Sequence, residues 1–290
     1  MMIREHGYSH WDGQFIERRL PWWPITRLNL KLAFRKKHFR PVYAFSFMPA
    51  FFFIVAIYIS ERIEDFQFIM RGGRAVLFEI NPNFFKNYLA SDFLLFMLIL
   101  IMVFAAAGLI ADDFRFNALT FYFSRPLRKR DYLLGKAAVI AFFVLSLTAI
   151  PAILFIFIKI LFAGNFSLLK NYPWLPLSII GYSLFLTFFY CIYALFLSCL
   201  SRHSRYVSVM IFAVYVFSDF LYGFFYNWFR QPFLLLLSLK HNLQQVAAFA
   251  FGVKPAQPVP WFWSFLVLGL FCLLAGYLII RKIRAVEVIR

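Results

Sequence analysis

The sequence has few charged residues and almost no cysteine. Only 15% of its 290 residues are charged and 63% are apolar, whereas a soluble domain has roughly 25% charged and 45–50% apolar residues. The shortage of charge excludes a soluble globular domain, and the high hydrophobicity excludes intrinsic disorder. All three cysteines lie inside apolar runs, which excludes a disulfide-stapled scaffold. A membrane protein with several spans remains.

Sequence motifs of catalysis are also missing. There is no H-E-x-x-H, and the five histidines are scattered over loops and flanks. Gly135-Lys136 does not end a P-loop, because Arg130 stands where the first glycine belongs and Ala137 follows the lysine. Asp219 is the single acidic residue well within an apolar run, so no carboxylate pair is expected at membrane depth. We expect no catalytic, cofactor or metal site, and we keep a membrane-embedded enzyme as an alternative.

Six apolar runs are long enough to cross a bilayer, which takes about 20 residues. Helices are expected, because lipid cannot satisfy open backbone groups. Residues 1–40 are polar and basic and do not resemble a cleavable signal peptide. We therefore predict an all-α membrane protein with an N-terminal segment, 1–40, and a six-span domain, 41–290. The predicted spans are about 41–60, 93–111, 137–158, 174–200, 206–229 and 261–280.

The net charge of the chain is +17, and its basic residues are distributed as the predicted topology requires. With the N-terminus inside, nine basic residues precede the first span, six lie between spans two and three, two between spans four and five, and four after span six. This excess of cytoplasmic Lys and Arg is the positive-inside pattern. It predicts that both termini are cytoplasmic and accounts for the charge without a nucleic-acid partner.

Two segments outside the spans show helical patterns. In residues 25–39, Ile25, Leu28 and Leu32 form an apolar face beside a basic one, which predicts an amphipathic helix on the membrane surface or against a partner. Between spans five and six, the apolar piece 233–239 is too short to cross the bilayer and is expected to be re-entrant or interfacial.

The loop after the second span predicts a short amphipathic helix. Asp112 and Asp113 suit its first turn, because carboxylates are favourable at a helix N-terminus, and Pro126 ends it. Four residues of this helix recur at helical spacing and form one largely aromatic face. Lipid or a soluble partner would shield this face from water. The residues of this face are Phe114, Ala118, Phe121 and Tyr122.

This loop resembles the corresponding region of ABC type-2 permeases, the membrane subunits of ATP-driven exporters. The resemblance lies in an acidic pair, a short helix, a Ser-Arg-Pro turn and a basic residue followed by Gly-Lys. Asn117-Ala118-Leu119 stands where the family often has Gly-Thr-Leu. The matching residues are Asp112-Asp113, Phe114 to Phe123, Ser124-Arg125-Pro126, Arg130 and Gly135-Lys136.

The resemblance implies a function and its partners. A cytoplasmic ATPase would bind ATP and magnesium and dock on the coupling helix, and a second permease copy or homologue would complete the path through a bacterial inner membrane. A non-transporting scaffold or assembly subunit is an alternative. The docking residues implied are Asp113, Phe114, Ala118, Phe121, Tyr122, Arg125 and Arg130.

Asp219, together with Tyr190 and Ser183, is a candidate for the substrate path. Ionisable residues at membrane depth usually face the interior of a helix bundle, so Asp219 either contacts substrate or locks its span to a neighbour through Ser183 or Tyr190. The aromatic side chains of spans four and five are compatible with a bulky or lipid-like substrate, but contact with acyl chains explains them more simply.

Overall fold

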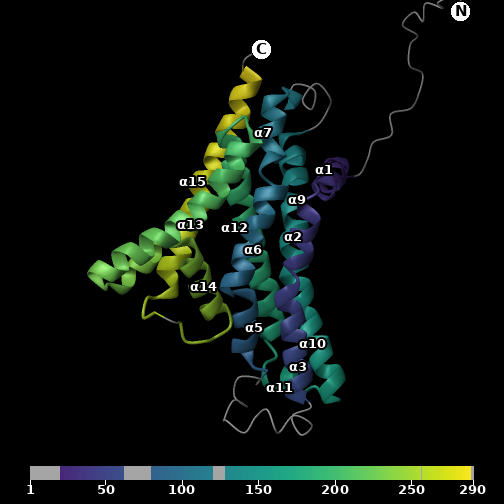
Figure 1. Ribbon diagram of the computed structural model, residues 1–290, viewed down its shortest axis with the longest axis vertical. Coiled ribbons are helices and arrows are strands. Elements are labelled where there is room, and N and C mark those ends of the chain that lie inside the picture. The colour runs from purple at the N-terminus through teal and green to yellow at the C-terminus, as the bar shows by residue number, and fades with distance from the viewer. Residues whose placement is uncertain (1–19, 62–79, 120–127, 256, 289–290) are drawn as a thin grey trace, which may run out of the picture.

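The computed structural model describes residues 20–61, 80–119, 128–255 and 257–288, with side chains described to residue 282. These residues form helices and no strand (Figure 1). The helices are α1 (Trp23–Arg35), α2 (Phe39–Phe45), α3 (Met48–Glu61), α5 (Pro82–Leu89), α6 (Asp92–Ala105), α7 (Gly108–Arg115), α9 (Lys129–Leu147), α10 (Ala149–Ala163), α11 (Ser167–Asn171), α12 (Leu175–Leu200), α13 (Ser204–Phe229), η3 (Pro232–Leu237), α14 (Leu239–Ala250) and α15 (Trp261–Val288).

The prediction of six spans is confirmed. Six helical stretches are long and apolar enough to cross a membrane, and they run over 39–61, 82–115, 129–163, 175–200, 204–229 and 261–282. The first three each consist of successive helices separated by short breaks. In Figure 1, α1, the end of α7 and the C-terminal part of α15 lie at one end of the bundle, which we call the α1 end. The opposite end, with α11, is the α11 end.

The break between α9 and α10 has a local cause. Pro151 has no N–H to bond the carbonyl four residues earlier, and that carbonyl belongs to Leu147, the last residue of α9. The hydroxyl of Tyr88 donates to the Leu147 carbonyl at 2.7 Å. A neighbouring helix therefore satisfies the backbone group that the proline leaves open, as membrane helices require.

The break between α6 and α7 is filled by a side chain of α12. The Ser198 hydroxyl donates to the carbonyl of Ala107 at 2.9 Å and accepts from the N–H groups of Ile110 and Ala111 at 3.0 and 3.1 Å. Ser198 is fully buried. An inserted polar side chain is a recognised cause of a helix kink, and here it also links the second span to the fourth.

Helix α12 lies at the centre of the bundle and packs against α7, α9, α10, α13, α14 and α15. Its buried Tyr182 and Tyr193 donate to the carbonyls of Leu243 and Ile211. Helix α13 also packs against α6, α7, α12, η3 and α14, but it buries only Val207, Ile211 and Tyr215, and Phe217 and Phe220 are exposed. The aromatic content of spans four and five therefore divides between a core helix and a helix whose rings face outward.

Helix α1 packs on α9 through an unexpected face. The buried residues are Ile25, Thr26 and Ala33, whereas Leu28 and Leu32, expected beside Ile25 on one face, are exposed. The helix ends at Arg35, not at Phe39, because the chain turns there and α2 begins. The exposed leucines leave an apolar strip on a helix whose opposite side is anchored to the bundle.

The segment between spans five and six holds more structure than the sequence predicted. The apolar piece 233–239 largely coincides with η3, and α14 follows it directly. Helix α14 packs against α12, α13 and α15, and its Asn242 and Gln245 are buried with their amides donating to backbone carbonyls. Helix α14 was not predicted, because it is shorter than a span and its composition is mixed.

Candidate functional site

A buried ion pair joins the two helices that flank the loop after the second span. Lys136 Nζ of α9 lies 2.8 Å from Asp113 Oδ2 of α7, with side-chain exposures of 2% and 13%. The Tyr132 hydroxyl donates to the same carboxylate oxygen at 2.6 Å, and Lys136 also contacts the side-chain carbonyl of Asn29 at 3.4 Å. We call Asn29, Asp113, Tyr132 and Lys136 the α7–α9 cluster. It holds the base of the loop closed and ties α1 to it.

Helix α1 reaches this cluster because one residue of α9 has no side chain. A Cβ on Gly135 would lie 3.0 Å from the Trp22 carbonyl oxygen and 3.0 Å from Ile25 Cβ, which is closer than ordinary van der Waals contact. The Thr26 hydroxyl donates to the Gly135 carbonyl at 2.9 Å. The Gly135-Lys136 pair thus places α1 directly against α9, and its lysine pairs with the acidic residue before the loop.

The acidic pair lies at a different position from the one predicted. Asp112 and Asp113 were expected in the first turn of the coupling helix, but they belong to the last turn of α7, which ends at Arg115. Carboxylates are unfavourable at this end of a helix, and nearby cations offset that cost. Besides Lys136, Lys36 carries a charge near Asp112; burial lowers the pKa of Lys36, and the Asp112 carboxylate opposes that shift.

The coupling-helix face is interrupted where the structure describes it. Phe116 and Asn117 separate α7 from the helical residues Ala118 and Leu119, and Asn117 has a φ of 52°. Phe114, in α7, lies under the Lys282 ammonium at 5.9 Å. Phe114 and Ala118 therefore do not share one continuous helix, because a left-handed residue lies between them.

Among the remaining predicted docking residues, the structure describes Arg130. It is exposed in the first turn of α9. Phe121, Tyr122 and Arg125 lie outside the described residues, so their part of the coupling helix stays a prediction.

A second charged cluster surrounds Asp219 of α13 and includes residues of α14, a helix in the half of the bundle nearer the α11 end (Figure 1). Lys240 Nζ lies 3.0 Å from Asp219 Oδ2 and 3.6 Å from Asp92 Oδ1. The Ser238 hydroxyl donates to Asp219 Oδ1 at 3.0 Å, and His241 Nδ1 lies 3.2 Å from the same oxygen. These five residues form the α13–α14 cluster, which links α6, α13 and α14.

Asp219 does not contact the residues proposed for it. Tyr190 is buried and its hydroxyl points to the Leu95 carbonyl at 3.4 Å, and the buried Ser183 hydroxyl has no hydrogen-bond partner among the described residues. The predicted lock through Ser183 or Tyr190 is therefore wrong, because Asp219 faces α14. The sequence pattern did not predict α14, and therefore it did not predict these partners of Asp219. The charged pair Lys240-His241 within an apolar stretch is the feature that could have indicated them.

The serine, histidine and aspartate of this cluster do not have the geometry of a nucleophile relay. Ser238 and Asp219 both contact the same histidine nitrogen, Nδ1, whereas a relay places nucleophile and carboxylate on opposite ring nitrogens. Ser238 is fully buried and also caps α14 by accepting from the His241 N–H at 3.3 Å. These contacts are those of an N-terminal cap of α14 that also links this helix to α13.

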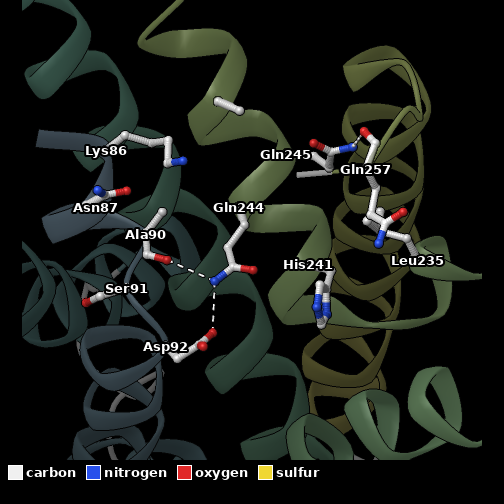
Figure 2. A pocket seen from close by; sticks show the side chains of 11 residues that line it. Lys86, Asn87, Ala90, Ser91, Asp92, Leu235, His241, Gln244, Gln245 and Gln257 are labelled. Carbon is white, nitrogen blue, oxygen red and sulfur yellow. Dashed lines mark hydrogen bonds between the residues drawn. The ribbon is translucent and has the colours of Figure 1, made fainter. Parts of the chain in front are cut away.

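A cavity of about 290 Å³ adjoins the α13–α14 cluster, between α5–α6 and α14 (Figure 2). Gln244 crosses it, and its amide donates to the Ala90 carbonyl at 3.0 Å and to Asp92 Oδ1 at 2.9 Å. Its other polar lining residues are Lys86, Asn87, Ser91, His241, Gln245 and Gln257. This lining offers both hydrogen-bond donors and acceptors.

Comparison with known proteins adds no family. No protein-family model matches the chain, and no curated protein matches it. Within the described residues, no group of three His, Cys, Asp or Glu side chains is placed to hold a metal ion.

Proposed function

We propose that this chain is the permease subunit of an ABC exporter in a bacterial inner membrane. It pairs with a second permease copy or homologue, and a separate cytoplasmic ATPase that binds ATP and magnesium docks on the loop between spans two and three. The α1 end faces the cytoplasm, so both termini are cytoplasmic. The chain's own part is to form the path and transmit movement.

The α7–α9 cluster is the observation that carries this proposal. A loop that receives force must be tied firmly to the helices it moves. Asp113 and Lys136 hold the two loop-flanking helices together at 2.8 Å in a buried setting, and Thr26 joins α1 to Gly135. Movement of the loop would therefore displace α1, α7 and α9 as a unit, because packed helices shift as rigid elements.

The outward face of α13 is a surface on which a second permease could pack. Exposed large apolar residues run along most of this helix, from Tyr206 through Phe217 to Trp228. Lipid covers such a face in a monomer, and another copy covers it in a dimer.

Purification from native membranes in detergent, followed by mass spectrometry and an ATPase assay, tests the proposal. We expect a P-loop ATPase to co-purify with the wild-type chain. Replacing Phe121 and Tyr122 by Ala removes two aromatic rings from the expected docking face and should abolish that association in a chain that still inserts.

The matched control removes two exposed rings near the α11 end, in Phe162→Ala with Phe166→Ala. This variant should retain the ATPase. If the wild-type chain purifies alone, or with soluble partners that hydrolyse no ATP, the exporter proposal fails, and a scaffold or a membrane-embedded enzyme becomes the better explanation.

A further inference from the structure

The cavity beside α14 is lined by a cation that has no partner among the described residues. Lys86 of α5 lines it, and Lys86 takes part in no ion pair or side-chain hydrogen bond in the described part of the chain. Figure 2 shows its side chain extending toward α14. Lys86 is partly buried, and a buried charge is costly unless an anion or water accompanies it. The position favours a ligand that brings a negative charge.

An available carboxylate lies on the same wall of the cavity. The Asp92 side chain is 72% exposed. Its contacts with Lys240 and Gln244 both use Oδ1, which leaves Oδ2 without a contact among the described residues. Lys86 and Asp92 thus present one free cation and one free carboxylate oxygen to the same space, the arrangement that a zwitterion complements.

The size of the cavity limits the ligand to a small polar group. A volume of about 290 Å³ is at the low end for ligand pockets. The amides of Asn87 and Gln244 also line the cavity, and amides supply hydrogen bonds of both kinds. This space suits a headgroup and excludes a whole lipid.

A groove adjoins the polar cavity at Asp92. It is a hollow of about 460 Å³ along α6 and α13, with Phe93, Phe96 and Val216 on its apolar side and Asp219 on its polar side. Asp92 lines both spaces, and Lys240 closes the polar side of the groove. A polar cavity joined to an apolar groove matches a molecule with a charged head and a hydrocarbon tail, rather than a soluble zwitterion.

We propose that the cavity binds the headgroup of a phospholipid that carries a primary amine. The phosphate pairs with the Lys86 ammonium, the amine donates to Asp92 Oδ2, and an acyl chain lies in the groove beside Phe93 and Phe96. This site goes beyond the proposed function, and binding to it requires no ATPase.

Native mass spectrometry of the delipidated full chain tests this site. The probes are phosphatidylethanolamine, phosphatidylcholine and phosphatidylglycerol with identical acyl chains, and soluble phosphoethanolamine. We expect phosphatidylethanolamine to bind about tenfold more tightly than phosphatidylcholine, because a trimethylated amine has no N–H to donate and a charged hydrogen bond is worth roughly 1.5 kcal/mol or more. Phosphoethanolamine alone should bind far more weakly than the lipid.

Two variants separate the parts of the site. Lys86→Gln should weaken binding of all three lipids about tenfold, since each carries a phosphate, and Lys86→Arg should restore it. Asp92→Asn should remove the preference for the ethanolamine lipid over the choline lipid. Lys170→Gln, which neutralises an exposed lysine in α11, is the control and should bind like wild type. The unfolding temperature of each variant verifies that it is folded.

Several outcomes overturn the assignment. Equal wild-type affinities for the ethanolamine and choline lipids, or unchanged affinities in Lys86→Gln, exclude this headgroup site. If soluble phosphoethanolamine binds as tightly as the lipid, the acyl groove has no role and a lipid ligand is excluded. Because no ATPase is present, failure here leaves the docking experiment unaffected, and loss of ATPase association leaves this result unaffected.

Discussion

The two charged clusters have nearly the same contact and opposite surroundings. Lys136 lies 2.8 Å from Asp113, and Lys240 lies 3.0 Å from Asp219. In the α7–α9 cluster the side-chain exposures of Lys136 and Asp113 are 2% and 13%, whereas in the α13–α14 cluster Lys240 is 18%, Asp219 is 35% and Asp92 is 72% exposed. A buried charge without its partner is strongly destabilising, but an exposed one is solvated. The same pairing therefore fixes structure at the α1 end and leaves charge available to a ligand nearer the α11 end.

The largest expected effect is the loss of the buried cation. Lys136→Met leaves the Asp113 carboxylate in a nearly dry setting, where breaking such a pair costs about 3–5 kcal/mol. The same substitution at Lys240 should cost at most about 1 kcal/mol, because its acidic partners remain partly exposed. The free energy of unfolding, measured by denaturant titration in mixed micelles, compares the two variants directly.

A double variant verifies the cause. Asp113→Asn combined with Lys136→Met removes both charges and should recover much of the stability lost by Lys136→Met alone. Equal losses in Lys136→Met and Lys240→Met would contradict the contrast between the two clusters.

The contact between α1 and α9 should give an intermediate effect. A Cβ at residue 135 meets backbone and a branched side chain at 3.0 Å, so Gly135→Ala forces α1 away and should cost about 1–3 kcal/mol, as overpacking does. Protease cleavage between α1 and α2 should become faster in this variant. Gly181 has open space around its Cβ position, so Gly181→Ala is the control, and a protease-resistant Gly135→Ala would refute the close contact.

The sequence predicted the spans better than it predicted their contacts. Each span requires about 20 mostly apolar residues, so the hydrophobicity of the sequence predicted all six. Helix α14 has 12 residues and a mixed composition, below the length of a span, and the partners of Asp219 were missed with it. Asp113 and Lys136 were both noted in the sequence, but hydrophobic patterns do not show which polar side chains meet across a loop. Which face of a helix is buried depends on how closely its neighbour can approach, as the contact of α1 with Gly135 shows.

Asp219→Asn should have a small effect on stability. The amide keeps the shape of the carboxylate and can still accept from Ser238, while Lys240 retains its contact with Asp92. We expect a loss of at most about 1 kcal/mol in the free energy of unfolding. If transport and assembly are also unchanged, Asp219 has no part in the substrate path. A loss comparable to that of Lys136→Met would mean that the α13–α14 cluster is as structural as the buried one.

The smallest effect is the pH response of His241, which lies in α14, outside the six spans. Burial lowers its pKa, the Lys240 cation lowers it further, and Asp219 and Asp92 oppose the shift; Ser238 and the Tyr222 ring are its other neighbours. A histidine with a lowered pKa in the folded state favours folding above the unfolded pKa of about 6.5, and that contribution is lost as pH falls below it. The unfolding temperature should therefore drop less in His241→Gln than in wild type when the pH is lowered from about 7.5 to about 5.5. Identical pH profiles would show that His241 does not titrate differently in the folded chain.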